Sequence, residues 1–486
     1  MKLSLKDRFF PPRLGDPVFS RQQITALLVP LIIEQILTQM IGLIGSIMVS
    51  SAGVAAFSGV ALVDSINSIV LSLFTSLSIG GTIVTSQFIG RGDKESARVS
   101  AQQVVIVSTG IAAVCGLLCV VFRYGLLDLV YNVEADVMES AAVYFLITAC
   151  SFPFMALFAA SSAIFRAAGN ARLPMLVSVW MNLINFGCNA LFIFVFKLGA
   201  AGPALSALVS RAIGSLIVSA KLSNKKLDIN IAGIFPLRLN IPMIKNILAI
   251  GIPSGVENSL LQVGRLLNQS ITSSFGTAAI AAASIGNHLN VVTLMPGTAV
   301  GNALLTVVGQ CVGAGKQEQA RRYTTGFVLM GLGSMVALNL VCLMFMDNII
   351  AMFINDASTP ELAMAITELS RKIVIILCIA SCFFAPFSFT LPNALRAAND
   401  VKFTMVMSLF SMFPVRILMG YLMSFHTPIR EMGIWYALML DWGFKGIACI
   451  IRFAGTKWTS HKILKGSAAK PKTDDTPKPE LEDEGT

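Results

Sequence analysis

The carboxylates inside long apolar stretches are the residues of this sequence best suited to do chemistry. Glu257 stands four residues after Pro253, in a stretch that we expect to span the membrane over 243–275. Proline lacks an N–H, so it frees a backbone carbonyl that can line a polar cavity beside the carboxylate. Because burying a charge in hydrocarbon costs about 2.5–3.5 kcal/mol or more, Glu257 is a candidate to bind a proton, Na⁺ or a cationic substrate. The alternative is a structural carboxylate paired with a neighbouring helix, for which Arg265 is the expected partner.

Asp64 is the corresponding candidate in the first half of the chain. It lies three residues before Asn67, so a helix places both side chains on one side, with enough oxygen atoms to help hold a small cation. The alternative is an aspartate that only hydrogen-bonds neighbouring helices. Glu34 is expected near one end of its span, where it either joins the site or is solvated. Asn287 occupies the position of Asp64 in the second half, and His288 beside it either titrates near physiological pH or serves as a hydrogen bonder.

A row of asparagines forms a further polar feature. Asn182, Asn185 and Asn189 recur at three- and four-residue spacing, which places their amides on one face of a helix. Amides inside a membrane must find partners, so we expect this face to point into the helix bundle. It either hydrogen-bonds neighbouring helices or lines a cavity for a cation or substrate.

Basic residues in the apolar stretches set the charge balance of any such site. Arg416 is expected either to neutralise Glu257 or Asp441, or to favour an anionic group on a substrate. Asp441 and Lys445 are four residues apart, a spacing at which a helix brings opposite charges together. We therefore expect a structural ion pair between those two side chains.

The composition determines the elements that must position these residues. The chain has 486 residues, of which 55% are hydrophobic and 13% charged, and its mean hydropathy is +0.75. Water-soluble proteins carry about 25% charged residues, so a soluble fold is excluded. In lipid every backbone polar group needs a partner within the protein, which makes each spanning segment a helix. The predicted fold is an all-α polytopic membrane protein.

Apolar stretches long enough to cross a bilayer recur along the whole chain. A helix of about 20 residues crosses the roughly 30 Å hydrocarbon core, and about twelve stretches meet that requirement. The predicted spans lie near 27–50, 57–89, 100–125, 138–165, 174–197, 201–221, 243–275, 279–312, 324–347, 367–395, 402–425 and 432–454.

The basic residues between these spans predict the orientation. The chain has a net charge of +10, and its Lys and Arg residues gather in the segments on the side of the N-terminus, such as 221–245 and the tail from 452. Cytoplasmic loops are enriched in such residues, so we expect both termini in the cytoplasm and the chain in the cell membrane. The positive charge then anchors the protein to an anionic leaflet and does not indicate nucleic-acid binding.

The sequence contains two copies of one unit. At an offset of 223 residues Pro30 aligns with Pro253, and Glu34 aligns with Glu257. Each copy has six spans, so both enter the membrane in the same direction and the symmetry axis runs along the membrane normal. The predicted domains are an N-terminal six-helix lobe over 1–222, a cytoplasmic linker over 223–242, a C-terminal six-helix lobe over 243–455 and a disordered cytoplasmic tail over 456–486.

Two short motifs recur within the repeat. The pattern Gln-x-x-Gly-x-Gly occupies 87–92 and again 310–315, while Arg-Ala-Ala begins at Arg166 and, at an offset of 230, at Arg396. The glycine motifs lack the Lys-Ser/Thr that grips phosphates in a nucleotide loop, so we expect them to end helices at the cytoplasmic face. With no ATP site predicted, energy is expected from an ion gradient or from a partner.

These motifs, in this order and on this number of spans, resemble the multidrug and toxic compound extrusion (MATE) family over about residues 25–458. The run Gly433-Ile434-Trp435-Tyr436-Ala437, followed by Leu440-Asp441-Trp442, adds to the resemblance.

The resemblance implies a secondary antiporter that uses an inward Na⁺ or H⁺ gradient to export organic, often cationic, compounds. It further implies that two lobes rock to give alternating access, and that a span-7 glutamate, here Glu257, takes part in coupling. Many members also carry an aspartate in the middle of span 1, and the matching position here is Gly45. The family's span-1 cation site therefore does not transfer: either Asp64 supplies the charge, or coupling moves to Glu257, or coupling is weak.

The expected partners are a small organic substrate and the lipid bilayer, with no nucleic acid and with the protein as a monomer. No cofactor is expected beyond the transported Na⁺ or H⁺. The main alternative is a flippase for lipid-linked saccharides or another amphiphile, which Arg211, Arg265 and Arg416 keep open because such a protein needs a more cationic cavity. A membrane enzyme or receptor is a third class, for which the sequence offers no catalytic constellation.

Overall fold

The computed structural model describes residues 17–50, 54–130, 135–234, 238–354 and 359–459. Within these ranges every regular element is a helix, as the composition predicts. The predicted tail from 456 lies almost wholly outside the described residues. The nine cysteines are free thiols.

The first lobe contains the predicted six spans, one of them broken and one ending in a π-helical turn. Its elements are α2 (Arg21–Ser50), α3 (Val54–Arg91), α4 (Lys94–Val121), the short α5 (Arg123–Val130), α6 (Ala135–Cys150), α7 (Phe152–Ala167), α8 (Arg172–Ala190) with η1 (Leu191–Val195), and α9 (Ala201–Leu222). We call this the N-lobe.

The second lobe repeats the arrangement. Its elements are α10 (Ile241–Ser273), α11 (Thr277–Gly313), α12 (Gln317–Met344), the short α13 (Met346–Ile354), α14 (Pro360–Phe383) with η2 (Pro386–Thr390) and α15 (Leu391–Ala397), α16 (Val401–Phe410) with η3 (Ser411–Leu418) and α17 (Met419–His426), and α18 (Gly433–Ala454). We call this the C-lobe.

Breaks occur where the sequence interrupts a helix in equivalent places of the two lobes. The axis turns by 42° between α6 and α7, next to Pro153, and by 59° between α14 and the segment that begins at Pro386. Among the described residues, eight helices are long and apolar enough to cross a membrane, or ten if each bent pair counts as one span. The remaining two predicted spans correspond to α2 and α10, which are long helices with an internal proline.

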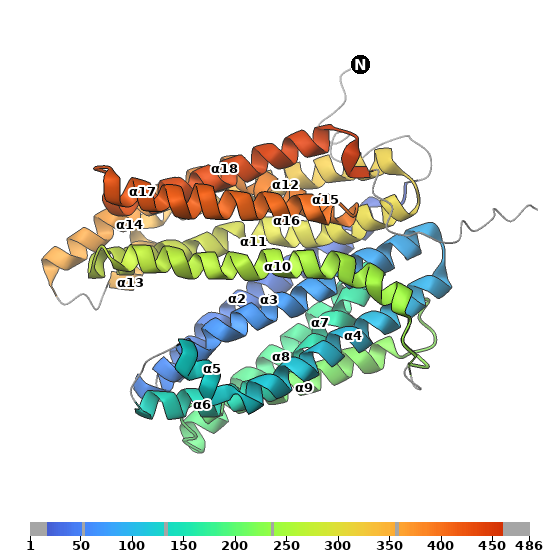
Figure 1. The fold of residues 1–486 in the computed structure, drawn as a ribbon, viewed down its shortest axis with the longest axis horizontal. Helices are drawn as coiled ribbons and strands as arrows, with labels where there is room; N and C mark the ends of the chain where they lie inside the picture. Colours follow the sequence, from blue (N-terminus) through green and yellow to red (C-terminus); the bar gives the residue numbers. More distant parts are fainter. Residues whose placement is uncertain (1–16, 51–53, 131–134, 235–237, 355–358, 460–486) are drawn as a thin grey trace, which may run out of the picture.

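The two lobes join at one end and diverge at the other. Figure 1 shows that they lie together where the linker runs, and spread apart toward α5, α6 and α13. We call these the linker end and the splayed end. Described residues of the linker pack on the N-lobe, because Arg98 and Gln103 on α4 donate to the carbonyls of Ala232 and Arg238 at 2.7 and 2.8 Å.

Helix α3 of the N-lobe packs along both α10 and α11 of the C-lobe. Polar side chains cross this seam: Asn258 donates to Ser76 Oγ at 2.9 Å, and the hydroxyls of Ser72 and Ser259 lie 3.1 Å apart. Helix α2 also bridges the lobes, since its buried Leu27 and other apolar residues near its start join a core cluster built mainly from the C-lobe.

Candidate functional site

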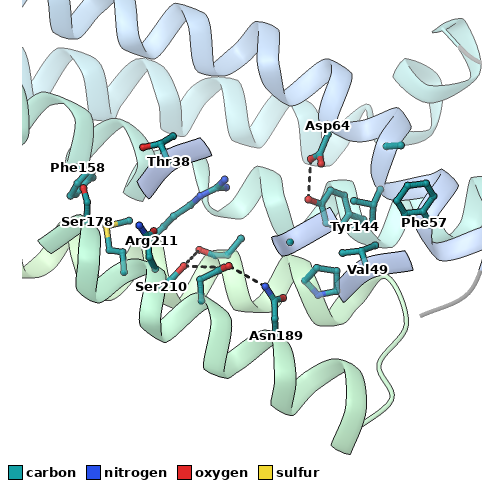
Figure 2. A pocket seen from close by; sticks show the side chains of 18 of the residues that line it. Thr38, Val49, Phe57, Asp64, Tyr144, Phe158, Ser178, Asn189, Ser210 and Arg211 are labelled. Carbon is teal, nitrogen blue, oxygen red and sulfur yellow. Dashed lines mark hydrogen bonds between the residues drawn. The ribbon is translucent and has the colours of Figure 1, made fainter. Parts of the chain in front are cut away.

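A cavity of about 440 Å³ with both polar and apolar walls lies inside the N-lobe. Helices α2, α3, α8 and α9 contribute most of its wall, with one residue each from α6 and α7, and Figure 2 shows side chains converging on it. It contains most of the N-lobe residues that the sequence singles out. The lining residues are Glu34, Thr38, Gly45, Val49, Phe57, Val60, Ala61, Asp64, Tyr144, Phe158, Ser178, Met181, Asn182, Asn185, Asn189, Pro203, Ala207, Ser210 and Arg211.

Asp64 presents its carboxylate to this cavity. The residue is exposed, and its Oδ1 accepts hydrogen bonds from Tyr144 Oη at 3.0 Å and from Asn67 Nδ2 at 3.3 Å. Both donors are neutral, so they orient the carboxylate and leave its negative charge in place. Arg211 lines the same cavity, but its Nη1 donates to Ser151 Oγ at 2.7 Å, and no ion pair with Asp64 is found among the described residues.

The structure differs from the prediction that Asp64 and Asn67 both offer oxygen atoms to a small cation. Asn67 lies within hydrogen-bonding distance of Asp64, as its spacing suggests, but it turns its amide nitrogen toward the carboxylate. Its oxygen is buried and has no hydrogen-bond partner. In this state Asn67 therefore supports Asp64 as a donor and does not act as a second oxygen ligand.

The asparagine row faces the cavity. Asn189 donates to Asn185 Oδ1 at 3.0 Å, Asn185 in turn approaches Ser210 Oγ at 3.5 Å, and Asn182 joins them in the wall. The row also serves as interhelical glue, because the contact between Asn185 and Ser210 links α8 to α9. The two interpretations are compatible in this structure.

Glu34 lies at the edge of the same cavity and forms an ion pair. Both of its carboxylate oxygens lie 3.3 Å from Nη1 of Arg166 on α7. Its side chain remains 13% exposed. Glu34 is thus neither freely solvated nor fully sealed, and a ligand in the cavity can reach it.

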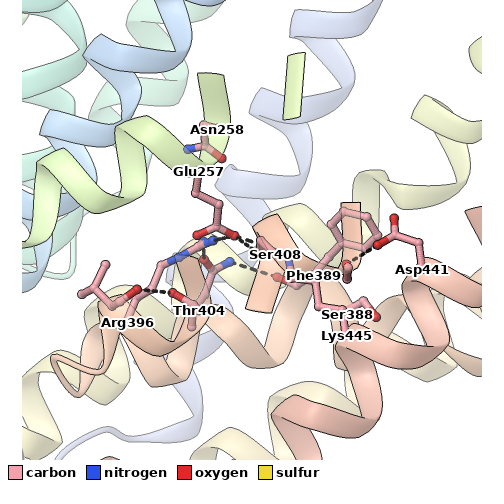
Figure 3. A network of polar contacts seen from close by, with 12 residues as sticks. Glu257, Asn258, Ser388, Phe389, Arg396, Thr404, Ser408, Asp441 and Lys445 are labelled. Carbon is pink, nitrogen blue, oxygen red and sulfur yellow. Dashed lines mark hydrogen bonds and ion pairs between the residues drawn. The ribbon is translucent and has the colours of Figure 1, made fainter. Parts of the chain in front are cut away.

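Glu257 is placed very differently in the C-lobe. Its side chain is 0% exposed, and its Oε1 lies 2.7 Å from Arg396 Nη2 and 3.3 Å from Lys445 Nζ (Figure 3). Ser408 donates a further hydrogen bond to the same oxygen. The carboxylate therefore has two buried basic partners, and the three side chains together carry a net charge of +1. The expectation that Arg265 pairs with Glu257 is wrong, because Arg265 is exposed and its Nη1 donates to Gln262 Oε1.

The expected ion pair between Asp441 and Lys445 is also wrong. Lys445 turns to Glu257, while Asp441 accepts from Ser411 and lies 3.8 Å from Nη1 of Arg416. The contact with Arg416 was one of the alternatives for that arginine. Two cross-helix pairs thus replace one pair within α18, since each carboxylate finds a basic partner on another helix.

Arg416 gains a second contact from α10. The amide of Asn268, with its oxygen toward the guanidinium, accepts from Arg416 Nε at 2.7 Å and Nη2 at 3.2 Å. Arg416 therefore links Asp441 and Asn268 in one polar network within the C-lobe.

Asn287 and His288 do not join any of these groups. Both residues are exposed on α11, and the His288 ring stacks on Phe353 at 6.0 Å between centroids. Among the described residues, no cluster of His, Cys, Asp or Glu of a size able to hold a metal ion is found.

The sequence interpretation missed three side chains that shape the sites. Tyr144 is the hydrogen-bond donor to Asp64, and no local pattern marks it. Arg166 and Arg396 are the ion-pair partners of Glu34 and Glu257. Both arginines open the repeated Arg-Ala-Ala motif, so their aligned positions were a signal that pairing the two repeats could have used.

Comparisons with known proteins agree with this arrangement. The MatE family model matches residues 30–191 and 253–422, one segment in each lobe. A probable multidrug resistance protein NorM from Thermotoga maritima is 23% identical over 468 residues, which cover 96% of this chain and 98% of the relative.

Solved structures show the same fold. A mutant of the Vibrio cholerae MATE transporter VcmN has a TM-score of 0.82 at 19% identity, over 91% of this chain and 98% of that one. An outward-facing multidrug resistance MATE family transporter of the MOP superfamily has a TM-score of 0.79 at 18% identity, over 89% and 94% of the two chains.

Proposed function

Because this chain belongs to the MatE family of multidrug efflux transporters, we propose that it is a secondary antiporter that exports organic cations in exchange for Na⁺ or H⁺. The N-lobe cavity is the proposed substrate site. Export follows from alternating access between the two lobes, with the linker end at the cytoplasm, as the distribution of basic residues predicts.

The observation that supports this proposal is the state of the Asp64 carboxylate. It faces a cavity of about 440 Å³ and is held by the neutral donors Tyr144 and Asn67. A cationic ligand can form a charge-assisted contact with such a carboxylate without first displacing a basic side chain. Phe57 and Phe158 in the wall supply apolar surface for the organic part of the ligand.

The same carboxylate is the proposed point of exchange. If Na⁺ or a proton occupies Asp64, the organic cation loses its counter-charge and is released, which links the two fluxes by competition. Glu257 is a poorer point of exchange in this state, because Arg396 and Lys445 already neutralise it and any entering cation meets their positive charge.

The flippase alternative is less well supported. It calls for a central cavity with excess positive charge, whereas Arg211 is the one basic side chain among the described residues that line the N-lobe cavity. Arg416 is paired with Asp441 in the other lobe, and Arg265 is exposed outside the cavity.

The test is efflux of a fluorescent cationic dye from vesicles that contain the purified protein. A sodium gradient and a proton gradient are imposed separately, and empty vesicles serve as the control. The proposal expects efflux to follow one of the two gradients and to vanish when that gradient is collapsed. Dye movement that ignores both gradients, together with scrambling of a labelled lipid, would support the flippase instead.

A further inference from the structure

The two ion pairs of the repeat, Glu34 with Arg166 and Glu257 with Arg396, occupy equivalent positions in the two lobes. The glutamates are related by the offset of 223 residues and the arginines by the offset of 230. In each lobe the glutamate lies on the first helix and the arginine opens an Arg-Ala-Ala turn at the linker end. The same contact thus exists twice, although the sequence around it has diverged.

Each Arg-Ala-Ala turn is gripped by a glutamine from the opposite lobe. Gln310 on α11 donates to the carbonyl of Ala167 in the N-lobe at 2.7 Å. Gln87 on α3 donates to the carbonyl of Ala397 in the C-lobe at 2.9 Å. Gln87 and Gln310 are themselves repeat partners, so the two cross-lobe contacts are reciprocal. We call them the glutamine latches.

The glycines of the same motifs let the two helices meet. A side chain at Gly90 would place its Cβ 2.0 Å from the carbonyl oxygen of Gln310, and one at Gly313 would place it 2.0 Å from that of Gln87. Contacts this short leave no room for a Cβ, so only glycine fits at these two positions. The repeated Gln-x-x-Gly-x-Gly motif is therefore a helix-to-helix joint between the lobes, in addition to a helix end.

The two latches differ in strength. Behind Ala397 the chain turns through Asn399, with φ of 71°, and its side chain exchanges two further hydrogen bonds with Gln87, at 3.0 and 3.4 Å. The equivalent residue behind Ala167 is Gly169, with φ of 82°, which has no side chain to offer. On that side Thr306 donates to the carbonyl of Arg166 at 3.1 Å.

We propose that Arg166 and Arg396 are positioning residues that couple the intramembrane glutamates to the closed joint at the linker end. Each arginine holds its glutamate with the guanidinium and belongs to the turn whose carbonyl the opposite lobe's glutamine binds. When a cation or proton binds the Glu34 carboxylate, the ion pair with Arg166 breaks. The freed Arg166 side chain then loosens the turn that the Gln310 latch binds. The inference rests on the proposed function, because it names the route by which a ligand in the N-lobe cavity affects the joint between the lobes at the linker end.

The lobes differ in how easily this route can be triggered. Glu34 lines the cavity and has one described basic partner, Arg166. Glu257 is fully buried and has Lys445 as well as Arg396. The N-lobe route is therefore the one that a ligand operates, and the C-lobe route keeps the lobes joined.

Hydrogen–deuterium exchange on the full-length protein in lipid nanodiscs, without substrate, tests the coupling. Arg166→Gln is expected to raise exchange about tenfold in 165–171 and also in 309–316 of the opposite lobe. Arg396→Gln is expected to do the same in 395–401 and 86–93. Arg166→Lys keeps the charge and should restore most of the protection, and Arg322→Gln, which removes a surface pair with Glu318, is the matched control.

Two results would overturn the coupling. One is a rise confined to the mutated turn, with the opposite glutamine segment unchanged. The other is a uniform rise that includes 100–120 of α4, because this indicates general unfolding. If an arginine variant does not fold, Glu34→Gln decides: it leaves Arg166 in place and must still raise exchange in 309–316.

The exchange measurement needs no transport, so its outcome is independent of the proposed export. If exchange rises in both lobes but the protein shows no dye efflux, the proposed export function is wrong and the coupling through the glutamine latches stands. If the protein exports dye but exchange rises only in the mutated turn, the export function stands and the coupling is wrong.

Discussion

The two lobes share a scaffold and an equivalent glutamate–arginine ion pair, but the N-lobe also has, in Asp64, a cavity-facing carboxylate for which no ion pair is found among the described residues. In the N-lobe, Asp64 faces a cavity with neutral donors around it. In the C-lobe, Glu257 and Asp441 are buried, and each has a basic partner on another helix. A carboxylate in the first setting can exchange ligands, whereas one in the second chiefly balances charge.

The largest effect is expected from neutralising Glu257. Glu257→Gln leaves Arg396 and Lys445 buried without a carboxylate, and breaking a buried pair in this way costs about 3–5 kcal/mol. The two basic partners therefore predict a marked loss of thermal stability. The melting temperature of the purified protein in detergent measures it.

A second substitution sharpens this prediction. Lys445→Met in the Glu257→Gln background removes one of the two stranded charges, so it should recover part of the lost stability. If the double variant melts below the single one, the charge-balance account of the C-lobe is wrong.

The next effect is expected at Asp64. Asp64→Asn removes the charge but keeps the shape, and a hydrogen bond to a charged group contributes about 1.5–3 kcal/mol, so half-saturation for a cationic dye should rise about ten- to hundredfold. Vesicle efflux at several dye concentrations measures it. The melting temperature should stay near that of the wild type, and a loss of stability equal to that of Glu257→Gln would erase the contrast between the lobes.

A smaller gain is expected at Gly45. It lines the cavity, and an added Cβ there meets nothing within 4 Å, so Gly45→Asp can place a further carboxylate beside Asp64 and Glu34. The attraction between one added carboxylate and the charge of the dye contributes about 1 kcal/mol when water surrounds both groups, so dye affinity should improve severalfold. Gly45→Asn is the matched neutral control; equal affinities for the two variants would show that the cavity does not select by charge.

The smallest effect is expected at His288. It stacks on Phe353 at an exposed site of the C-lobe, away from the cavity. His288→Ala should change stability by about 0.5 kcal/mol or less and leave the rate of dye efflux unaltered. A marked loss of efflux by this variant would place a functional group in the C-lobe, outside the N-lobe cavity.

The sequence predicts the scaffold well because spans and repeats are local or periodic properties. The helices and the shared face of Asn182, Asn185 and Asn189 follow from apolar length and helical spacing. These signals need no knowledge of which helices touch.

The ion pairs could not be predicted in the same way, because they join helices far apart in the chain. Spacing within α18 favoured Asp441 with Lys445, yet tertiary packing brought Lys445 to Glu257 and Arg416 to Asp441. The orientation of the Asn67 amide, by contrast, follows from a local contact, because the Asp64 carboxylate three residues earlier only accepts hydrogen bonds. Exchange of partners in a low-dielectric interior is governed by distance, which sequence separation does not encode.

Equilibrium binding of a fluorescent cationic dye to the purified protein tests the division between the lobes most directly. Asp64→Asn is compared with Ser408→Ala, which removes one hydrogen bond from Glu257 and leaves its ion pairs in place. The account predicts that Asp64→Asn weakens dye binding about ten- to hundredfold while Ser408→Ala binds like the wild type. Unchanged binding by Asp64→Asn, together with lost binding by Ser408→Ala, would contradict it and place the substrate site in the C-lobe.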